Sequence, residues 1–398
     1  MPEIPDPSAL VFNGFAPRLM EIGGGGAGRL PALLAKLGLS RPFVVTDPVM
    51  VKLGLIERVT GPLESAGVMP SVFSDTVPEP VDTVIHAGVE KARAGDFDCI
   101  IAVGGGSPID TAKAIGILLA APAGAKLRDF KVPVAADTAA LPLIAVPTTA
   151  GTGSEATRFT VITDTENDEK MLIGGLGALP YAAVVDFELS MSAPRRVTAD
   201  TGIDAFTHAL EAYVSRRAHP LSDAYATAAM RLIGRHLRQA YAHPDDRTAR
   251  AGMMLGATLA GLAFSNASVA LVHGMSRPIG AHFHVPHGMS NAMLLPAVTR
   301  WSLNAALPRY AEAARLAGFA REGEADQLAG ARLLESLDSL NQDLAVPTPE
   351  GFGVGRAAWD AKIAQMAEQA LASGSPANNP AIPDAAEIAT LYGQIFTR

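Results

Sequence analysis

The chain has 398 residues, of which 48% are hydrophobic and 18% charged, so it is globular and long enough for two domains with separate cores. Its net charge is −8 and it has no block of lysine or arginine, which argues against nucleic acids and anionic membranes as partners. Its single cysteine, Cys99, excludes an internal disulfide, and MPEIPDPSAL lacks the basic and apolar regions of a signal peptide, so we expect a cytoplasmic protein.

The first half of the chain alternates between short apolar runs and helical patterns. The runs PFVVTD (42–47), CIIAVGGGS (99–107) and LPLIAVPTT (141–149) are each followed by a turn or a helical stretch. FTVITD (159–164) and AAVVDFEL (182–189) complete the series. Apolar strands separated by helices indicate an α/β domain with a mostly parallel sheet that is covered on both faces.

Strand-like runs disappear after Pro194, and Ala- and Leu-rich helical periodicity continues to the end of the chain. We therefore predict an α/β domain over residues 1–192 and an all-helical domain over 193–398. Residues 251–272 carry no charge, and this segment is long enough to span a bilayer. Polar residues interrupt it, however, and favour a buried helix. The segment 373–383 (SGSPANNPAIP) predicts a surface loop before a last helix.

Two glycine-rich loops compete as a nucleotide site. Gly23, Gly25 and Gly28 match the G-x-G-x-x-G fingerprint of dinucleotide-binding folds. The match lies in a run of four glycines, and the preceding stretch FNGFAPRLMEI contains a proline and is a poor buried strand. We therefore favour a tight turn at a helix N-terminus for this first loop.

The second loop is better placed because it follows a clean strand and opens a helix. Backbone N–H groups without a neighbouring Cβ can approach a pyrophosphate, and the helix dipole favours the anion. The loop residues are Gly104, Gly105, Gly106 and Ser107, and the hydroxyls at the end of the next strand belong to Thr148, Thr149, Thr152 and Ser154. Asp110 either caps this helix or lines the cofactor cleft.

Asp47 also stands at the end of a predicted strand. Its carboxylate can accept both hydroxyls of an adenosine ribose, and it would repel a 2′-phosphate, which favours NAD over NADP. The alternative is an aspartate that begins a turn before Pro48.

Four residues in the second half can form a metal site. Asp204 and His208 lie four apart in TGIDAFTHALEAY, so they share one face of a helix. His273 opens HGMSRPIG, and His287 follows in VPHG. One carboxylate and three imidazoles suit a divalent transition metal such as Fe(II), Zn or Mn.

Together, these strings resemble the iron-containing (group III) alcohol dehydrogenases. The matching pieces are GGGSPIDTAK (104–113), PTTAGTGSEAT (147–157), TGIDAFTHALEAY (201–213) and HGMSRPIGAHFHVPHG (273–288), in the order of the family. The resemblance implies a dehydroquinate-synthase-like fold, with a nucleotide-binding α/β domain, a helical domain and an active site in the cleft between them. It implies an alcohol–carbonyl oxidoreductase that uses NAD and Fe(II), with Zn as the alternative metal, and a homodimer.

The resemblance also implies roles for individual residues. Asp204, His208, His273 and His287 would bind the metal. Cofactor contacts would come from Asp47, Gly105, Gly106, Ser107, Thr148, Thr149, Thr152, Lys170 and Leu189. Glu211, one turn after His208, either accepts a proton from a metal-bound imidazole or forms an ordinary salt bridge.

One position departs from the family pattern. Many members carry a histidine four residues after the third metal ligand, where it is thought to relay the proton, whereas this chain has Arg277. Arginine stays protonated and is a poor base, so His284 or a water chain through the cofactor ribose would have to replace the relay. Arg277 is either a structural salt-bridge residue or a partner for an anionic substrate, and the second option predicts a preference for an ω-hydroxy acid or its semialdehyde.

Three other functions remain open at this stage. A dehydroquinate-synthase-type lyase would share the fold, NAD and the metal, but it needs a basic cluster that the sequence does not show. A zinc-dependent glycerol-type dehydrogenase also shares the fold. A non-catalytic helical assembly protein is disfavoured because all four ligands are present.

Overall fold

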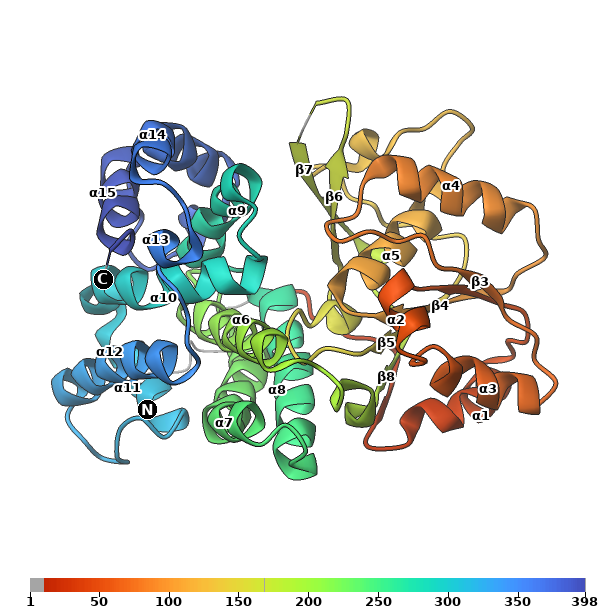
Figure 1. Ribbon diagram of the computed structural model, residues 1–398, viewed down its shortest axis with the longest axis horizontal. Helices are drawn as coiled ribbons and strands as arrows, with labels where there is room; N and C mark the ends of the chain where they lie inside the picture. Colours follow the sequence, from red (N-terminus) through yellow and green to blue (C-terminus); the bar gives the residue numbers. More distant parts are fainter. Residues whose placement is uncertain (1–10, 168, 398) are drawn as a thin grey trace. The chain divides into compact units, whose positions relative to one another are not determined.

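A computed structural model of the chain describes residues 11–167 and 169–397 and separates into two compact units (Figure 1). The α/β unit comprises residues 15–192, and the helical unit comprises residues 193–397 together with residues 11–14. The first ten residues, on which the signal-peptide prediction rests, lie outside the described part of the chain.

The α/β unit is built on a six-stranded sheet in which every pair of neighbouring strands is parallel. The strand order is β1-β8-β5-β4-β2-β3. The strands are β1 (Leu19–Ile22), β2 (Pro42–Val45), β3 (Ser71–Phe73), β4 (Cys99–Gly104), β5 (Leu143–Pro147) and β8 (Ala182–Val185). The central strands are buried on both faces, as expected for apolar runs in a parallel sheet.

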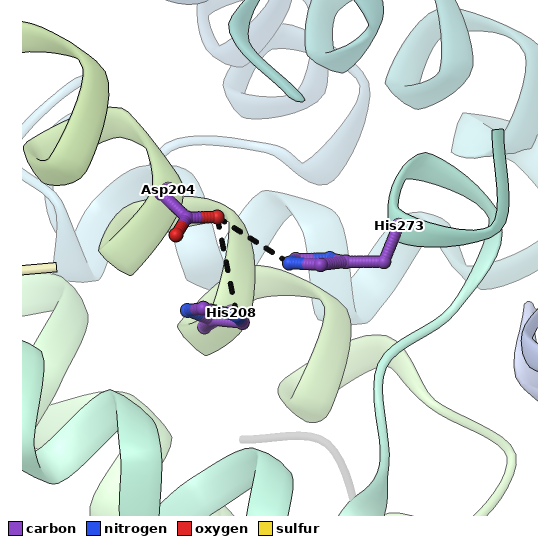
Figure 2. A group of neighbouring side chains, drawn as sticks. All are labelled: Asp204, His208 and His273. Atoms are coloured by element: carbon purple, nitrogen blue, oxygen red, sulfur yellow. Dashed lines mark ion pairs between the residues drawn. The ribbon is translucent and has the colours of Figure 1, made fainter. Parts of the chain in front are cut away.

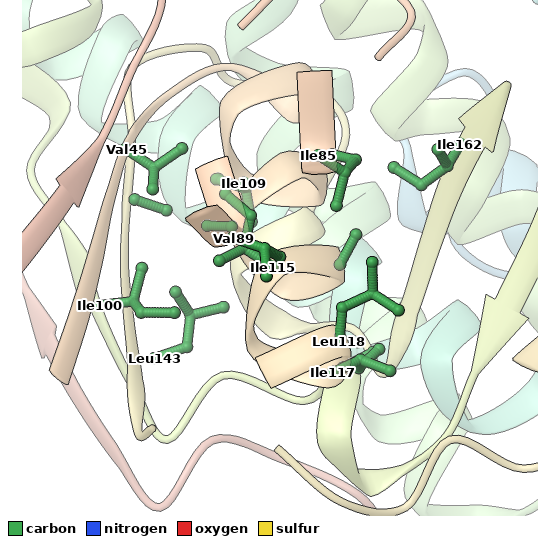
Figure 3. Close-up of a cluster of buried hydrophobic side chains, with 14 of the residues drawn as sticks. Val45, Ile85, Val89, Ile100, Ile109, Ile115, Ile117, Leu118, Leu143 and Ile162 are labelled. Carbon is green, nitrogen blue, oxygen red and sulfur yellow. The ribbon is translucent and has the colours of Figure 1, made fainter. Parts of the chain in front are cut away.

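Helices cover both faces of this sheet, and alternate residues of each strand face one or the other. Side chains such as Val45 and Ile100 pack against α4 (Asp82–Arg93) and α5 (Gly106–Ala120), as Figure 3 shows. The intervening residues, Val44 and Ile101 among them, pack against α1 (Leu30–Leu37) and α3 (Glu57–Ser65). Because the helices after β2 and β4 lie on opposite faces, a crevice for a ligand is expected at the carboxyl ends of these two strands.

Cys99 begins β4, in the middle of the sheet, and is fully buried. Burial raises the pKa of its thiol far above the ordinary value, and the neighbouring Asp98 carboxylate adds to the rise. The thiol is therefore an apolar packing group of the core.

Three details of the α/β unit differ from the sequence prediction. The segment FTVITD forms β6 (Phe159–Asp164), which pairs in antiparallel fashion with β7 (Glu169–Gly174) as a separate two-stranded sheet. The stretch that looked like a poor buried strand contains β1, a half-buried strand at the sheet edge. The helical stretch after β2 is divided into α2 (Pro48–Lys52) and α3, with a turn at Gly54 between them. Short or edge strands lack the apolar run that marks a buried strand.

The helical unit contains no strand among the residues that the structure describes, which confirms the predicted helical C-terminal part. Its helices are α6 (Arg195–Val214), α7 (Pro220–Ala242), α8 (Arg247–Ala267), α9 (Leu271–Phe283), α10 (His287–Ser302), α11 (Leu307–Leu316), α12 (Asp326–Asp343), α13 (Pro349–Phe352), α14 (Arg356–Ala372) and α15 (Ala385–Ile395). The predicted loop before the last helix is present and includes a short 3₁₀ turn, Ser375–Asn378, but the prediction that it lies at the surface is wrong for Ser375, Asn378 and Asn379, which are buried.

The uncharged run of residues 251–272 is split between α8 and α9. Across the described residues, no single helix combines the length and the apolar character needed to cross a membrane. Helices α8 and α9 meet this criterion only when taken together, and they are bent by 104° relative to each other.

Candidate metal centre and nucleotide-binding loops

The four predicted metal ligands come together inside the helical unit. Asp204 and His208 lie one turn apart on α6, while His273 lies in the first turn of α9 and His287 is the first residue of α10. The Nε2 atoms of His273, His287 and His208 lie 3.4, 3.8 and 3.9 Å from Asp204 Oδ1. Figure 2 shows Asp204, His208 and His273 pointing toward one another, and their candidate ligand atoms all lie within 4.8 Å of each other.

The cluster is closed on one side and open on the other. The side chains of Asp204, His208 and His273 are 3–6% exposed, whereas that of His287 is 44% exposed. The His208 ring stacks between Phe264 and the His273 ring, with centroid distances of 4.2 and 4.4 Å, which fixes the ring plane. A buried ligand set with one accessible side is the arrangement of a catalytic metal site, which needs a free position for substrate.

The electrostatics of the cluster favour a cation. Burial opposes the charge of Asp204, but the nearby imidazoles outweigh it and hold the pKa of the carboxyl well below its usual range. Burial likewise opposes the charge of His273, but Glu211 and Asp204 raise the pKa of this imidazole to about 9. The donor set of one carboxylate and three imidazoles therefore fits a divalent transition metal in both chemistry and charge.

Glu211 fixes the orientation of His273. The Nδ1 atom of His273 lies 2.6 Å from Glu211 Oε2, so a neutral ring carries its proton there and turns the lone pair of Nε2 toward the metal position. The same carboxylate accepts the backbone N–H groups of Ala270 and Val272, so it also caps the N-terminus of α9. Of the two roles that the sequence left open for Glu211, its contact with His273 fits the acceptance of an imidazole proton.

Close packing explains the glycine that follows His287. A Cβ on Gly288 would lie 2.3 Å from the backbone oxygen of Asp200 on α6, which leaves no room for a side chain. The missing side chain lets the start of α10 approach α6, and this contact brings His287 to the ligands on α6.

A further residue of the cluster, Asn291, is absent from the sequence prediction. It lies four residues after His287 on α10, and its amide nitrogen contacts Asp204, His273 and His287. The spacing of one helical turn from His287 was the available signal, but an asparagine at that spacing has no metal-site meaning by itself.

Catalytic roles were predicted for two further residues, Arg277 and His284. Arg277 lies one turn after His273 on α9, is half-buried, and makes neither a hydrogen bond nor an ion pair with any residue that the structure describes. Burial lowers the pKa of its guanidinium, and the charge of Glu211 opposes this shift. The structural salt bridge that was the alternative role for Arg277 is therefore not formed.

His284 ends α9 as its C-terminal cap, in the left-handed conformation with φ 55°, and is exposed. Among the described interactions, none joins His284 to the four candidate ligands. The neighbouring His282, which was not predicted to be a ligand, contacts the Gln369 side chain at 2.8 Å.

The second glycine-rich loop of the α/β unit lies at the carboxyl ends of adjacent strands. Gly104 ends β4 with φ 148°, and a Cβ there would lie 2.5 Å from the ring of Pro108. Gly105 precedes α5 as its N-cap, and Gly106 and Ser107 form the first turn of that helix. The backbone N–H groups of this turn have no partner within the helix, which is the property that an anion site requires.

The threonine-rich loop after β5 packs directly on these glycines. Thr148 is buried, and its N–H donates to the carbonyl of Gly104 at 2.9 Å. A Cβ on Gly106 would lie 3.0 Å from Thr152 Cγ2, and one on Gly105 would lie 3.3 Å from Thr149 Oγ1. The structure thus brings together the two loops that the sequence assigned to the pyrophosphate.

A buried polar network anchors the threonine-rich loop after β5 to α5. Lys113 is 1% exposed, and its ammonium group donates to Ser154 Oγ, to both oxygens of Thr157 and to the carbonyl of Phe159, at 2.8–3.1 Å. Asp110 accepts the hydroxyl of Ser154 at 2.6 Å and the N–H of Val161 at 2.9 Å. Asp110 and Ser154 therefore position the loop through their side chains.

The first glycine-rich loop is closed by a carboxylate of the protein itself. Buried Asp186 accepts the N–H groups of Gly25 and Ala27, both at 3.1 Å. The backbone donors that a pyrophosphate would need are therefore occupied, and the loop leads into a single 3₁₀ turn, Gly26–Arg29. The structure therefore agrees with the prediction of a tight turn, and it disagrees with the dinucleotide site that the fingerprint alone would predict.

The remaining predicted cofactor residues have structural roles of their own. Asp47 follows β2, and its Oδ1 accepts the N–H groups of Val49 and Met50, so it caps α2. Lys170 on β7 forms an ion pair with Glu79 at 2.7 Å. The side chain of Leu189 is buried in the core beneath α1 and α3, which leaves its backbone as the part that can meet a ligand.

A parallel sheet with a phosphate-type loop and a helical unit with a carboxylate–imidazole cluster define a nucleotide-linked metalloenzyme. Comparison with known proteins identifies its family. Residues 17–187 match the family model for iron-containing alcohol dehydrogenase, and residues 198–396 match that for the C-terminal part of the same family.

Individual relatives extend over nearly the whole chain. The long-chain-alcohol dehydrogenase 1 of Geobacillus thermodenitrificans (strain NG80-2) is 40% identical over 358 residues, 89% of each chain. The crystal structure of a 1,3-propanediol oxidoreductase has 35% identity and a TM-score of 0.92, covering 97% of this chain and 100% of that one. A sulfoacetaldehyde reductase from Bifidobacterium kashiwanohense, solved with NAD+, has 27% identity and a TM-score of 0.87, with coverage of 98% and 100%.

The chain belongs to the iron-containing alcohol dehydrogenase family. It is therefore an oxidoreductase whose reaction depends on NAD and a metal, and this assignment favours the dehydrogenase over the lyase and the non-catalytic alternatives.

Proposed function

We propose that the protein interconverts an alcohol that carries an anionic group, such as an ω-hydroxy acid, and the matching aldehyde, with NAD as hydride carrier. The observation that carries this proposal is Arg277, a half-buried cation one turn from His273 that has no partner among the described residues. An arginine in such a position binds a carboxylate or sulfonate well because its planar group forms two parallel hydrogen bonds. The sulfoacetaldehyde reductase offers support, because its name gives it an anionic aldehyde as substrate.

In this reaction the residues of the chain bind, orient and select. When bound, the metal supplies Lewis acidity to the substrate oxygen, and NAD exchanges the hydride. Asp204, His208, His273 and His287 would hold the ion, and Glu211 keeps the Nε2 lone pair of His273 directed at it. The proton route through His284, or through water and the cofactor ribose, remains a prediction, as do a homodimer and a cytoplasmic location.

The substrate proposal predicts a preference that kinetics can measure. With the Fe(II)-loaded, oxygen-protected enzyme, kcat/KM should be at least about tenfold higher for a carboxylate-bearing alcohol–aldehyde pair than for a neutral pair of equal length, or about 1.4 kcal/mol. Arg277→Ala should remove most of that advantage, because kcat/KM should fall for the carboxylate-bearing pair, which binds the guanidinium, and not for the neutral pair.

A matched control is available on α10, where Arg300 forms an exposed ion pair with Asp338 at 2.8 Å. Arg300→Ala should leave both substrate pairs unchanged. Equal losses for the anionic and the neutral pair in Arg277→Ala, or a wild-type preference for the neutral pair, would contradict the proposal.

We also propose that Asp47 binds the adenosine ribose and selects NAD over NADP. Because Asp47 caps α2, the test variant is Asp47→Asn, which preserves the cap but removes the negative charge. The ratio of kcat/KM for NADP to that for NAD should rise about tenfold or more, since the repulsion of the 2′-phosphate is gone. An unchanged ratio in this variant would leave Asp47 with the capping role alone.

A further inference from the structure

Asn291 lies among the metal-binding atoms of the helical unit. It is fully buried on α10, and its Nδ2 atom is 2.7 Å from Asp204 Oδ1 and 3.2 Å from both His273 Nε2 and His287 Nε2. These three atoms belong to three of the four candidate ligands, so a single amide group touches most of the metal centre.

The atoms that Asn291 contacts are those whose lone pairs a metal ion needs. Glu211 accepts the Nδ1 proton of His273, so Nε2 of the neutral ring carries the lone pair that a metal ion takes. An amide nitrogen provides two N–H donors and no acceptor. The amide can therefore donate to Asp204 in the metal-free protein, but Nδ2 cannot keep its place beside the two Nε2 atoms once an ion takes their single lone pairs.

The oxygen of the Asn291 amide provides a second observation. Asn291 Oδ1 is buried and has no hydrogen-bond partner among the residues that the structure describes. A buried carbonyl oxygen without a partner is unfavourable, so turning the amide over breaks no hydrogen bond at this atom. The turn would direct Oδ1 toward the ligands, and amide oxygen is an accepted donor for divalent cations.

We propose that Asn291 is a two-state member of the metal centre. In the metal-free protein Nδ2 donates to Asp204 and lies beside Nε2 of His273 and of His287, and in the metal-loaded protein Oδ1 serves as an additional oxygen donor. This role concerns the metal centre alone and does not depend on which substrate the enzyme prefers.

Two substitutions in the full-length, metal-stripped protein test this role, with zinc ion as the probe. Asn291→Ala removes both ends of the amide, so the dissociation constant for zinc, measured by chelator competition, should rise about 10–100-fold. Asn291→Asp keeps an oxygen but loses the donor and adds a second carboxylate beside Asp204. Its metal-free form should unfold at a lower temperature than wild type, whereas its affinity for zinc should equal or exceed that of wild type.

Asn341 provides the matched control. It is also buried, and its amide donates to the carbonyl of Ala292 on the same helix α10 at 2.7 Å. Asn341→Ala should lower the unfolding temperature with and without zinc by the same amount, and leave the zinc dissociation constant unchanged. The proposal is overturned if Asn291→Ala binds zinc as wild type does, if Asn291→Asp weakens binding as much as Asn291→Ala, or if Asn341→Ala weakens it equally.

Discussion

Replacing His273 by alanine should remove the metal and the turnover together. His273 is 3% exposed, points its Nε2 at Asp204 and is oriented by the contact of its Nδ1 with Glu211, so its loss removes a positioned ligand from the cluster. A metal ion contributes several kcal/mol to the stabilisation of developing charge, so loss of the ion should lower kcat/KM about 10³-fold or more. Metal content per chain and NADH formation, measured on the same reconstituted sample, report the two effects.

Two further variants separate loss of the ligand from loss of the fold. Asp204→Asn keeps the size of the side chain and an oxygen but removes its charge, and it should also lower metal content and turnover. His282→Ala changes a histidine on the same helix whose ring contacts Gln369, and it should keep both metal and turnover. A His273→Ala enzyme with full metal content and full turnover would show that the metal centre lies elsewhere.

The second large effect is expected at Lys113. Lys113→Met keeps most of the apolar stem but leaves Asp110, Ser154 and Thr157 without their buried cation. Removing one member of a buried charge network costs roughly 3–5 kcal/mol. For a unit of this size the unfolding temperature should fall by roughly 6–20 °C. The affinity for NADH should fall as well, because the loop of Thr152 and Ser154 loses its anchor to α5.

An exposed lysine and a double variant provide the controls for Lys113→Met. Lys126 forms an exposed ion pair with Glu166, so Lys126→Met should change stability by less than about 0.5 kcal/mol. In the double variant Lys113→Met/Asp110→Asn both buried charges are gone, and its loss should be smaller than the sum of the two single losses. Additive losses, or an unaltered unfolding temperature in Lys113→Met, would contradict the proposed network.

The sequence predicted the parts of the fold that follow simple periodicity. Runs such as CIIAVGG and LPLIAVP became β4 and β5 because β-branched apolar residues suit strands buried on both faces. The segment FTVITD was correctly predicted to be a strand, β6, but its antiparallel partner β7 and the edge strand β1 were not predicted, since their half-buried residues carry no such run. Helical spacing placed Asp204 and His208 on one face, and the family resemblance supported the assignment of His273 and His287 to the same site.

Contacts between residues far apart in the chain explain what the sequence could not show. Asp186 closes the first glycine loop from 161 residues away, so the loop looks like a nucleotide site until the fold is known. Asn291 reaches Asp204 across 87 residues, and Lys113 reaches Thr157 across 44. Such pairings depend on how helices and strands pack, and local patterns do not encode them.

The buried position of Cys99 makes its thiol unreactive toward oxidants and alkylating reagents in the folded protein. Its thiol is the single one of the chain, and it stands in the central strand β4 with its reactive thiolate form suppressed by burial. Alkylating reagents should label it only when the sheet opens, so labelling measures local unfolding of the α/β unit. If exposure to air inactivates the enzyme while Cys99 can still be alkylated after unfolding, oxidation of this thiol is excluded as the cause, and fresh Fe(II), rather than a thiol reductant, should restore turnover.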